Sequence, residues 1–169
     1  MGGDGCDALC VLEKGFRCTS STQHDGGSGV GGLDSCAPLC GDGISLAPRG
    51  LEGCDDNNTV SGDGCNGTCG VELGYTCGGG GPGGRDTCAS VCGDGRRVGG
   101  EGCDDGNEVA GDGCGASCEV EPGYACAGGT GATADACTAC HASCGTCTGT
   151  SYGECTSCAT TWSKCPPWQ

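Results

Sequence analysis

Two acidic loops hold the side chains of this sequence that are best suited to bind a metal ion. Their oxygen-bearing residues lie close together between glycines and cysteines. Ca²⁺ takes about six to eight oxygen ligands and accepts backbone carbonyls as well as carboxylates. The ligand spacing of an EF-hand is absent, so the sequence predicts an irregular Ca²⁺ loop. The candidate ligands are Asp94, Asp104, Asp105, Asn107 and Asp112 in the later loop and Asp42, Asp55, Asp56, Asn58 and Asp63 in the earlier one.

The same side chains have a second use that needs no metal. Asp and Asn cap turns by accepting hydrogen bonds from nearby backbone N–H groups. The two uses are compatible with each other. The sequence therefore leaves open whether these loops are Ca²⁺ sites, capped turns or both, and it implies no other cofactor.

The acidic loops belong to a repeat. Five cysteines recur with a constant offset of 49 residues, as from Cys54 to Cys103, and Cys40 and Cys92 open the two copies within Cys-Gly-Asp-Gly segments. A partial copy near the start contains only Cys6, Cys10, Cys18 and Cys36. We therefore expect a segment of a longer protein, divided into repeats at 1–39, 40–91 and 92–139 and a different cysteine-rich module at 140–169.

The partial copy also suggests a disulfide pattern. If its four cysteines pair only among themselves, the two cysteines that it lacks must pair with each other in a complete copy. This reasoning predicts the bridges Cys40–Cys54 and Cys92–Cys103. Six cysteines allow many other connectivities.

The composition indicates a fold held together by disulfides. The 169 residues include 22 cysteines but only 17 Leu, Ile, Val and Phe residues together, and the net charge is −15. Each bridge stabilises a small domain by about 2–4 kcal/mol, and bridges persist in oxidising compartments. We therefore predict an extracellular location. The acidity argues against nucleic acid and anionic membranes as partners, and no apolar run has transmembrane length.

A short β-hairpin is predicted in each repeat. In the third, Pro122 and Gly123 suit the centre of a type II turn, and an aromatic residue follows that we expect to pack on bridges. We expect the glutamates before these turns to accept backbone N–H groups, and they are Glu13, Glu72 and Glu121. The glycine-rich segments 19–35, 78–87 and 127–136 are predicted to be exposed tips. The predicted fold is a small disulfide-rich, linear array of cysteine-knotted modules with short β-hairpins and little or no helix.

Residues 3–137 resemble the myxococcal-type cysteine-rich repeat of large secreted and surface proteins. The resemblance rests on Cys-Gly-Asp-Gly at 92–95, Glu-x-Cys-Asp-Asp-Gly-Asn at 101–107, Gly-Asp-Gly-Cys at 111–114, and Glu-x-Gly-Tyr-x-Cys at 121–126. The second copy departs from the pattern at Asn57, where the family has glycine.

The C-terminal module resembles the furin-like repeat of growth-factor-receptor cysteine-rich regions. The match covers Cys-His-x-Ser-Cys-x-Thr-Cys-x-Gly at 140–149 and Cys-x-Ser-Cys at 155–158. This resemblance implies the bridges Cys140–Cys147, Cys144–Cys155 and Cys158–Cys165. Neither resemblance implies catalysis, and both imply stacks of small modules that display surfaces or act as spacers.

The remaining motifs suit a secreted chain. Asn57-Asn58-Thr59 and Asn66-Gly67-Thr68 are N-glycosylation sequons, although Ser and Thr are common enough here for a coincidence. The Cys-x-x-Cys pairs lack the βαβ context of thiol oxidoreductases. The chain has two histidines and no nucleophile–base arrangement, so we expect no enzymatic activity.

These observations favour a structural or adhesive role as a spacer, a matrix component or part of a surface filament. Its partners would be other modules or subunits of the same assembly, and glycans. The alternatives are a ligand-binding receptor ectodomain with Ca²⁺-rigidified repeats and a thiol redox or metal-storage protein.

Overall fold

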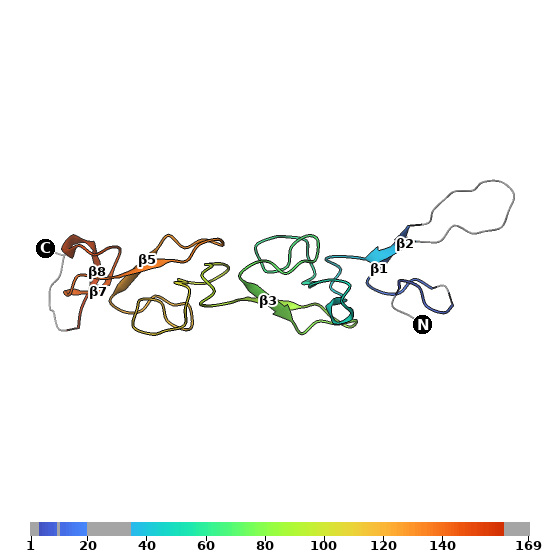
Figure 1. Cartoon of the computed structure of the whole chain (residues 1–169), viewed down its shortest axis with the longest axis horizontal. Coiled ribbons are helices and arrows are strands. Elements are labelled where there is room, and N and C mark those ends of the chain that lie inside the picture. The colour runs from blue at the N-terminus through green and yellow to red at the C-terminus, as the bar shows by residue number, and fades with distance from the viewer. Residues whose placement is uncertain (1–3, 10, 20–34, 161–169) are drawn as a thin grey trace. The chain divides into compact units, whose positions relative to one another are not determined.

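The computed structural model describes residues 4–9, 11–19 and 35–160. Eight four-residue strands form antiparallel pairs in these residues, and the only helical turns are two 3-10 turns, Ala47–Arg49 and Tyr152–Glu154 (Figure 1). The strand pairs are β1 (Phe16–Thr19) with β2 (Ser35–Pro38), β3 (Tyr75–Gly78) with β4 (Thr87–Ser90), β5 (Tyr124–Ala127) with β6 (Ala136–Ala139), and β7 (Cys144–Cys147) with β8 (Cys155–Cys158). The prediction of a small disulfide-rich fold with short hairpins and little helix is confirmed.

The chain divides into two compact units. The first comprises residues 1–72 and 77–88, and the second comprises residues 73–76 and 89–169. Each unit contains one complete acidic loop with its bridges. The two loops have the same internal design, with equivalent bridges and equivalent buried aspartates.

The disulfides connect the two complete repeats in the same way. The bridges are Cys40–Cys69, Cys54–Cys65 and Cys77–Cys88 in one repeat and Cys92–Cys118, Cys103–Cys114 and Cys126–Cys137 in the next. The predicted bridges Cys40–Cys54 and Cys92–Cys103 are therefore wrong.

The prediction failed because its premise fails in the complete repeats. Cys65 and Cys69, the equivalents of Cys6 and Cys10, bond to Cys54 and Cys40 and not to each other. The acidic loop reverses the chain and returns Cys65 to Cys54. The backbone N–H groups of Gly53 and Cys54 then donate to the Cys69 carbonyl at 2.8 and 3.2 Å, which fixes Cys69 beside the start of the acidic loop.

In the C-terminal module the structure joins Cys140 to Cys147 and Cys144 to Cys155, the pairs that the furin-like resemblance implies. The third implied pair, Cys158–Cys165, cannot be followed because Cys165 lies outside the described residues.

Sulfur takes the place of an apolar core. Cys54, Cys65, Cys103 and Cys114 are at most 1 % exposed, whereas Val60 and its equivalent Val109 are each 62 % exposed. Phe16 and Leu46 are the only buried hydrophobic side chains other than cysteines in the described residues. Burial in this chain is thus concentrated around the bridges.

The hairpins dock on the second glycine of the Gly-Asp-Gly-Cys motif. Cys126 and Cys137 lie directly opposite each other in β5 and β6, and their bridge packs on Gly113. A Cβ at Gly113 would lie 2.4 Å from the Cys137 Cβ and 3.0 Å from the Tyr124 ring. The Tyr124 ring and the Cys126–Cys137 bridge thus both face Gly113 at this site.

The glutamates before the hairpin turns hold the motif in place. Glu72 Oε2 accepts the N–H groups of Gly62 and Gly64 at 2.7 and 3.0 Å. Glu121 accepts those of Gly111 and Gly113 in the same way. Glu13 Oε2 accepts the Gly5 N–H at 3.2 Å. The predicted role of these glutamates as N–H acceptors is confirmed.

The packing on Gly113 predicts a specific loss of stability. Both Gly113 and Gly111 have positive φ, 127° and 98°, but nothing lies within 4 Å of a Cβ at Gly111. Gly111→Ala should cost about 1–2 kcal/mol through its left-handed backbone, and Gly113→Ala about 1–3 kcal/mol more through overpacking. Denaturant unfolding with intact disulfides measures the difference. Equal losses in the two variants would show that the hairpin bridge does not press on Gly113.

Candidate functional site in the acidic loops

One aspartate of each acidic loop is buried under the segment that opens the repeat. Asp104 is fully buried. Its Oδ1 accepts the N–H groups of Gly95 and Gly106, each at 2.9 Å, and its Oδ2 accepts that of Gly93 at 3.0 Å. The carboxylate thus ties the Cys-Gly-Asp-Gly segment to the acidic loop.

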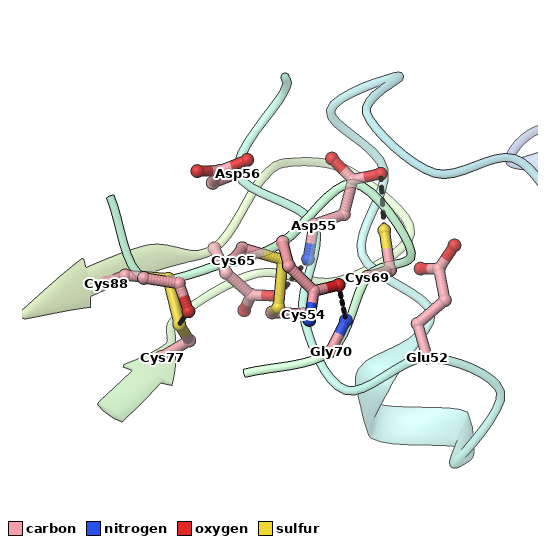
Figure 2. The surroundings of a disulfide bond; sticks show 12 residues. Glu52, Cys54, Asp55, Asp56, Cys65, Cys69, Gly70, Cys77 and Cys88 are labelled. Carbon is pink, nitrogen blue, oxygen red and sulfur yellow. Dashed lines mark hydrogen bonds between the residues drawn. A yellow bond between two sulfur atoms is a disulfide. The ribbon is translucent and has the colours of Figure 1, made fainter. Parts of the chain in front are cut away.

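Asp55 has the same role in the earlier repeat. It is fully buried, its Oδ2 accepts the N–H groups of Gly41 and Asp42, and its Oδ1 accepts those of Gly43 and Asn57. A carboxylate offers about four lone-pair positions, so these four donors occupy them. Their positive dipole ends surround the oxygens, which leaves Asp55 unsuited to hold a cation. In Figure 2 this side chain points toward Cys69, away from the neighbouring Asp56.

A second buried aspartate in each repeat was missed by sequence reasoning. Asp135 Oδ2 accepts the Asp104 N–H at 3.0 Å, and the Asp135 N–H donates back to the Asp104 carbonyl at 2.5 Å. Asp86 bonds to Asp55 in the same reciprocal way, at 2.9 and 2.6 Å. These pairs connect the hairpin segment to the acidic loop.

The sequence assigned these two residues to exposed glycine-rich tips, and that assignment is wrong for them. Asp86 and Asp135 are only 4 % and 6 % exposed. A signal was present, because they are separated by the same 49-residue offset and each precedes a hairpin cysteine by two positions.

Each of these buried carboxylates has further partners. Asp86 accepts a hydrogen bond from the Gly80 N–H at 2.9 Å. Burial raises the pKa of Asp86, but hydrogen bonds from the Ser45 hydroxyl and from the Asp55 and Gly80 N–H groups outweigh it and lower this pKa below its ordinary value. Asp135 Oδ1 forms an ion pair with Arg97 Nη1 at 3.2 Å. Arg97 and Ser45 occupy the same place, five residues after the opening cysteine.

The lowered pKa of Asp86 predicts a pH-dependent contribution to folding. Its stabilisation is present above the unfolded pKa of about 3.9 and is lost as the pH falls through the lower folded pKa. At pH 7, Asp86→Asn should cost about 1.5–3 kcal/mol, the range for hydrogen bonds to charged groups. The deficit should shrink at strongly acidic pH.

Urea unfolding curves at neutral and strongly acidic pH test this prediction. Asp94→Asn is the control, because Asp94 is an exposed carboxylate. A deficit in Asp86→Asn that is independent of pH would contradict the assigned role of the charge.

The other loop residues form a partly exposed group. The Asn58 N–H donates to Asp56 Oδ1 at 3.2 Å, and its side-chain Nδ2 donates to Asp63 Oδ2 at 3.0 Å. In the later loop Asn107 Nδ2 donates to Asp105 Oδ1 at 3.1 Å. Burial, followed by repulsion from Asp112, raises the pKa of Asp105.

The structure therefore splits the predicted ligand set of each loop. Asp56, Asn58 and Asp63 lie together, as do their equivalents Asp105, Asn107 and Asp112. Asp55 and Asp104 are held apart in the buried network. Asp42 Oδ1 accepts the Ile44 N–H at 2.9 Å and so caps its own segment, and Asp94 is exposed.

A glutamate lies beside each buried aspartate. Glu52 Oε2 accepts the Leu46 N–H at 2.9 Å, and its Oε1 is buried without a hydrogen-bond partner. Burial, in part offset by this N–H, and repulsion from Asp55, Asp42 and Asp86 raise the pKa of Glu52. Ligand atoms of Glu52, Asp55 and Cys69 lie within 4.8 Å of one another. However, the Asp55 lone pairs are occupied and the Cys69 sulfur is in a bridge, so this group is poorly suited to hold a metal ion.

Comparison with known families identifies the acidic loop and its two bridges as a unit. Residues 33–70 and 85–119 each match the family described as Domain of unknown function (DUF4215). Each match ends one residue after Cys69 or Cys118. It therefore includes both the bridge from that cysteine to Cys40 or Cys92 and the bridge that spans the acidic loop. No match was found among curated proteins or among solved structures.

Proposed function

We propose that this chain is a non-enzymatic structural or adhesive segment of a larger secreted or cell-surface protein. It would act as a spacer, a matrix component or part of a surface filament, with other modules or subunits of the same assembly as its partners. The supporting observation is that eight of the ten buried hydrophobic side chains in the described residues are cysteines. Bridges of this density persist in oxidising compartments, which supports an extracellular location.

Two further features support this role. In the described residues, the nine bridges and the buried carboxylate network each connect residues of the same repeat or module. The net charge of −15 disfavours nucleic acid and anionic membranes as partners. Separately, the helical turns found in residues 4–9, 11–19 and 35–160 include none that could span a membrane.

We assign the repeats more finely to the myxococcal-type cysteine-rich repeat and residues 140–169 to a furin-like module. The bridges Cys140–Cys147 and Cys144–Cys155 support the second assignment. The Asn57 departure is compatible with the first. Asn57 has φ 76° and its equivalent Gly106 has φ 91°, and asparagine tolerates this left-handed conformation better than most residues.

Alkylation of the secreted chain tests the scaffold role. We expect the cysteines of the nine described bridges to resist alkylation in denaturant and to react only after reduction, as followed by intact mass. Reduction should also turn a protease-resistant chain into a rapidly degraded one. Extensive alkylation before reduction would contradict the scaffold and favour the thiol redox or metal-storage alternative.

A ligand-binding ectodomain with Ca²⁺-rigidified repeats is the second candidate. It is supported by the Asp105 carboxylate, which is partly buried near the like charge of Asp112 and has a raised pKa. A bound cation would relieve this repulsion. Asp55 and Asp104 take no part in this proposal.

A Ca²⁺ titration separates this candidate from turns alone. Extracellular modules bind Ca²⁺ with a Kd of about 10⁻⁴–10⁻³ M, so about 5 mM Ca²⁺ should stabilise the chain by at least about 1 kcal/mol. The shift in Tm should shrink in the double variant Asp105→Asn, Asp112→Asn and persist in Asp94→Asn. An unchanged Tm of the unmodified chain in Ca²⁺ would leave Asp105 and Asp112 with turn roles only.

A further inference from the structure

In the turn at Asn66, the oxygen of the side-chain amide accepts hydrogen bonds and the nitrogen donates none within the described part of the chain. Asn66 Oδ1 accepts the N–H of Thr68 at 2.9 Å, the Thr68 hydroxyl at 2.7 Å and the N–H of Gly70 at 3.0 Å. Asn66 Nδ2 donates no hydrogen bond to any described residue, whereas Asn58 Nδ2 donates to Asp63. The oxygen therefore holds the turn, and the nitrogen is not needed for it.

The other repeats show that this turn does not require asparagine. Asp7 occupies the equivalent position in the first repeat, and its Oδ1 accepts the N–H groups of Leu9 and Val11 at 2.8 and 2.9 Å. The third repeat has Gly115 at this position and closes the turn with the backbone alone, through the Cys118 N–H to the Gly115 carbonyl at 2.8 Å. Only the second repeat carries an amide nitrogen here.

Asn66-Gly67-Thr68 is a sequon, and its geometry presents the acceptor group. Gly67 and Thr68 are exposed. The turn is closed by hydrogen bonds over two and four residues, so it depends on local chain alone. A group attached to Asn66 Nδ2 would leave all three bonds to Oδ1 in place.

The second sequon, Asn57-Asn58-Thr59, lies in a different environment. The Asn57 amide oxygen faces Gly43, where a Cβ would lie 2.4 Å from it, and the Thr59 methyl faces Gly41 at 2.7 Å from its Cβ position. Asn57 and Thr59 are exposed, but both side chains contact the opening segment that Asp55 holds. The Thr68 hydroxyl donates a hydrogen bond to the Asn66 amide oxygen, whereas no such bond joins Thr59 to the Asn57 amide.

We propose that Asn66 is the N-glycosylation site of this chain and that Asn57 is not glycosylated. The donor class is an oligosaccharide joined through its anomeric carbon to a lipid diphosphate, in the secretory pathway. Asn66 Nδ2 forms the new bond to the anomeric carbon and loses one proton to a base. The bond from that carbon to the phosphate oxygen breaks, and the lipid diphosphate leaves with the electron pair. The proposal rests on the extracellular role given above.

The glycan would stand beside a bridge of the second repeat. The Cys69 N–H donates to the Asn66 carbonyl at 2.8 Å, and that carbonyl oxygen is 3.8 Å from Cys40 Sγ. The sugar would therefore distinguish the second repeat from the third, where Gly115 carries no acceptor.

The test is site occupancy in the full chain secreted from a eukaryotic host. Enzymatic deglycosylation in heavy-oxygen water marks each occupied asparagine by peptide mass. We expect a label at Asn66 and none at Asn57. Asn66→Asp should remove the glycan, and Asn57→Gly should leave it; both changes introduce a residue that another repeat already has at that position. Thr68→Ser, which introduces the residue of the third repeat, should keep the glycan, and Thr68→Ala should lose it.

Two outcomes would overturn the proposal. One is an unlabelled Asn66 in secreted chain whose bridges are intact, and the other is comparable labelling of Asn57. The bridge analysis of the same sample separates this failure from a failure of the scaffold role, since free thiols would contradict the scaffold whatever the glycan state.

Discussion

The structure of each repeat depends on one buried carboxylate that accepts backbone N–H groups from the segment that opens the repeat. Asp55 and Asp104 accept three and two N–H groups from that segment, and each accepts one more from its own loop. Burying an ionised group is costly unless hydrogen bonds replace its water. Here most of the donors come from the glycine-rich opening segment, where Gly41 and Gly93 have positive φ and no side chain. Where large apolar residues are scarce, this interaction orders loops that hydrophobic burial cannot order.

The disulfides and the second buried aspartate extend this centre to the rest of the repeat. Cys40–Cys69 and Cys54–Cys65 enclose the Asp55 loop, and Asp86 ties the hairpin segment to it through a reciprocal pair of bonds. Figure 2 shows the bridges Cys54–Cys65 and Cys77–Cys88 with Asp55 and Glu52 in the same region. The arrangement is complete within a single repeat. Each complete repeat thus contains its own bridges and its own buried carboxylates.

Part of this design could be predicted from the sequence. Turn chemistry at Pro122-Gly123 identified a hairpin, and the recurrence of Glu72 and Glu121 identified N–H acceptors, because both depend on short stretches of chain. The bridge partners of Cys40 and Cys54 could not be predicted, since they depend on how the acidic loop folds back. Asp86 and Asp135 recur two positions before a hairpin cysteine, but this recurrence does not itself indicate burial, because glycine-rich polar segments usually lie on the surface. The acidic loop residues were grouped as one set, whereas neighbouring Asp104 and Asp105 differ in burial and in partners.

The most direct test of the account is disulfide mapping of the unreduced protein. Cleavage at acidic residues separates Cys40 and Cys54 from the peptide that holds both Cys65 and Cys69, and fragmentation between Cys65 and Cys69 identifies the partner of each. The account predicts peptides that join Cys40 to Cys69 and Cys54 to Cys65, with the equivalent pairs Cys92–Cys118 and Cys103–Cys114. Peptides that join Cys40 to Cys54 or Cys92 to Cys103 would contradict it, because the opening segment could not then lie over the buried aspartate in the way described.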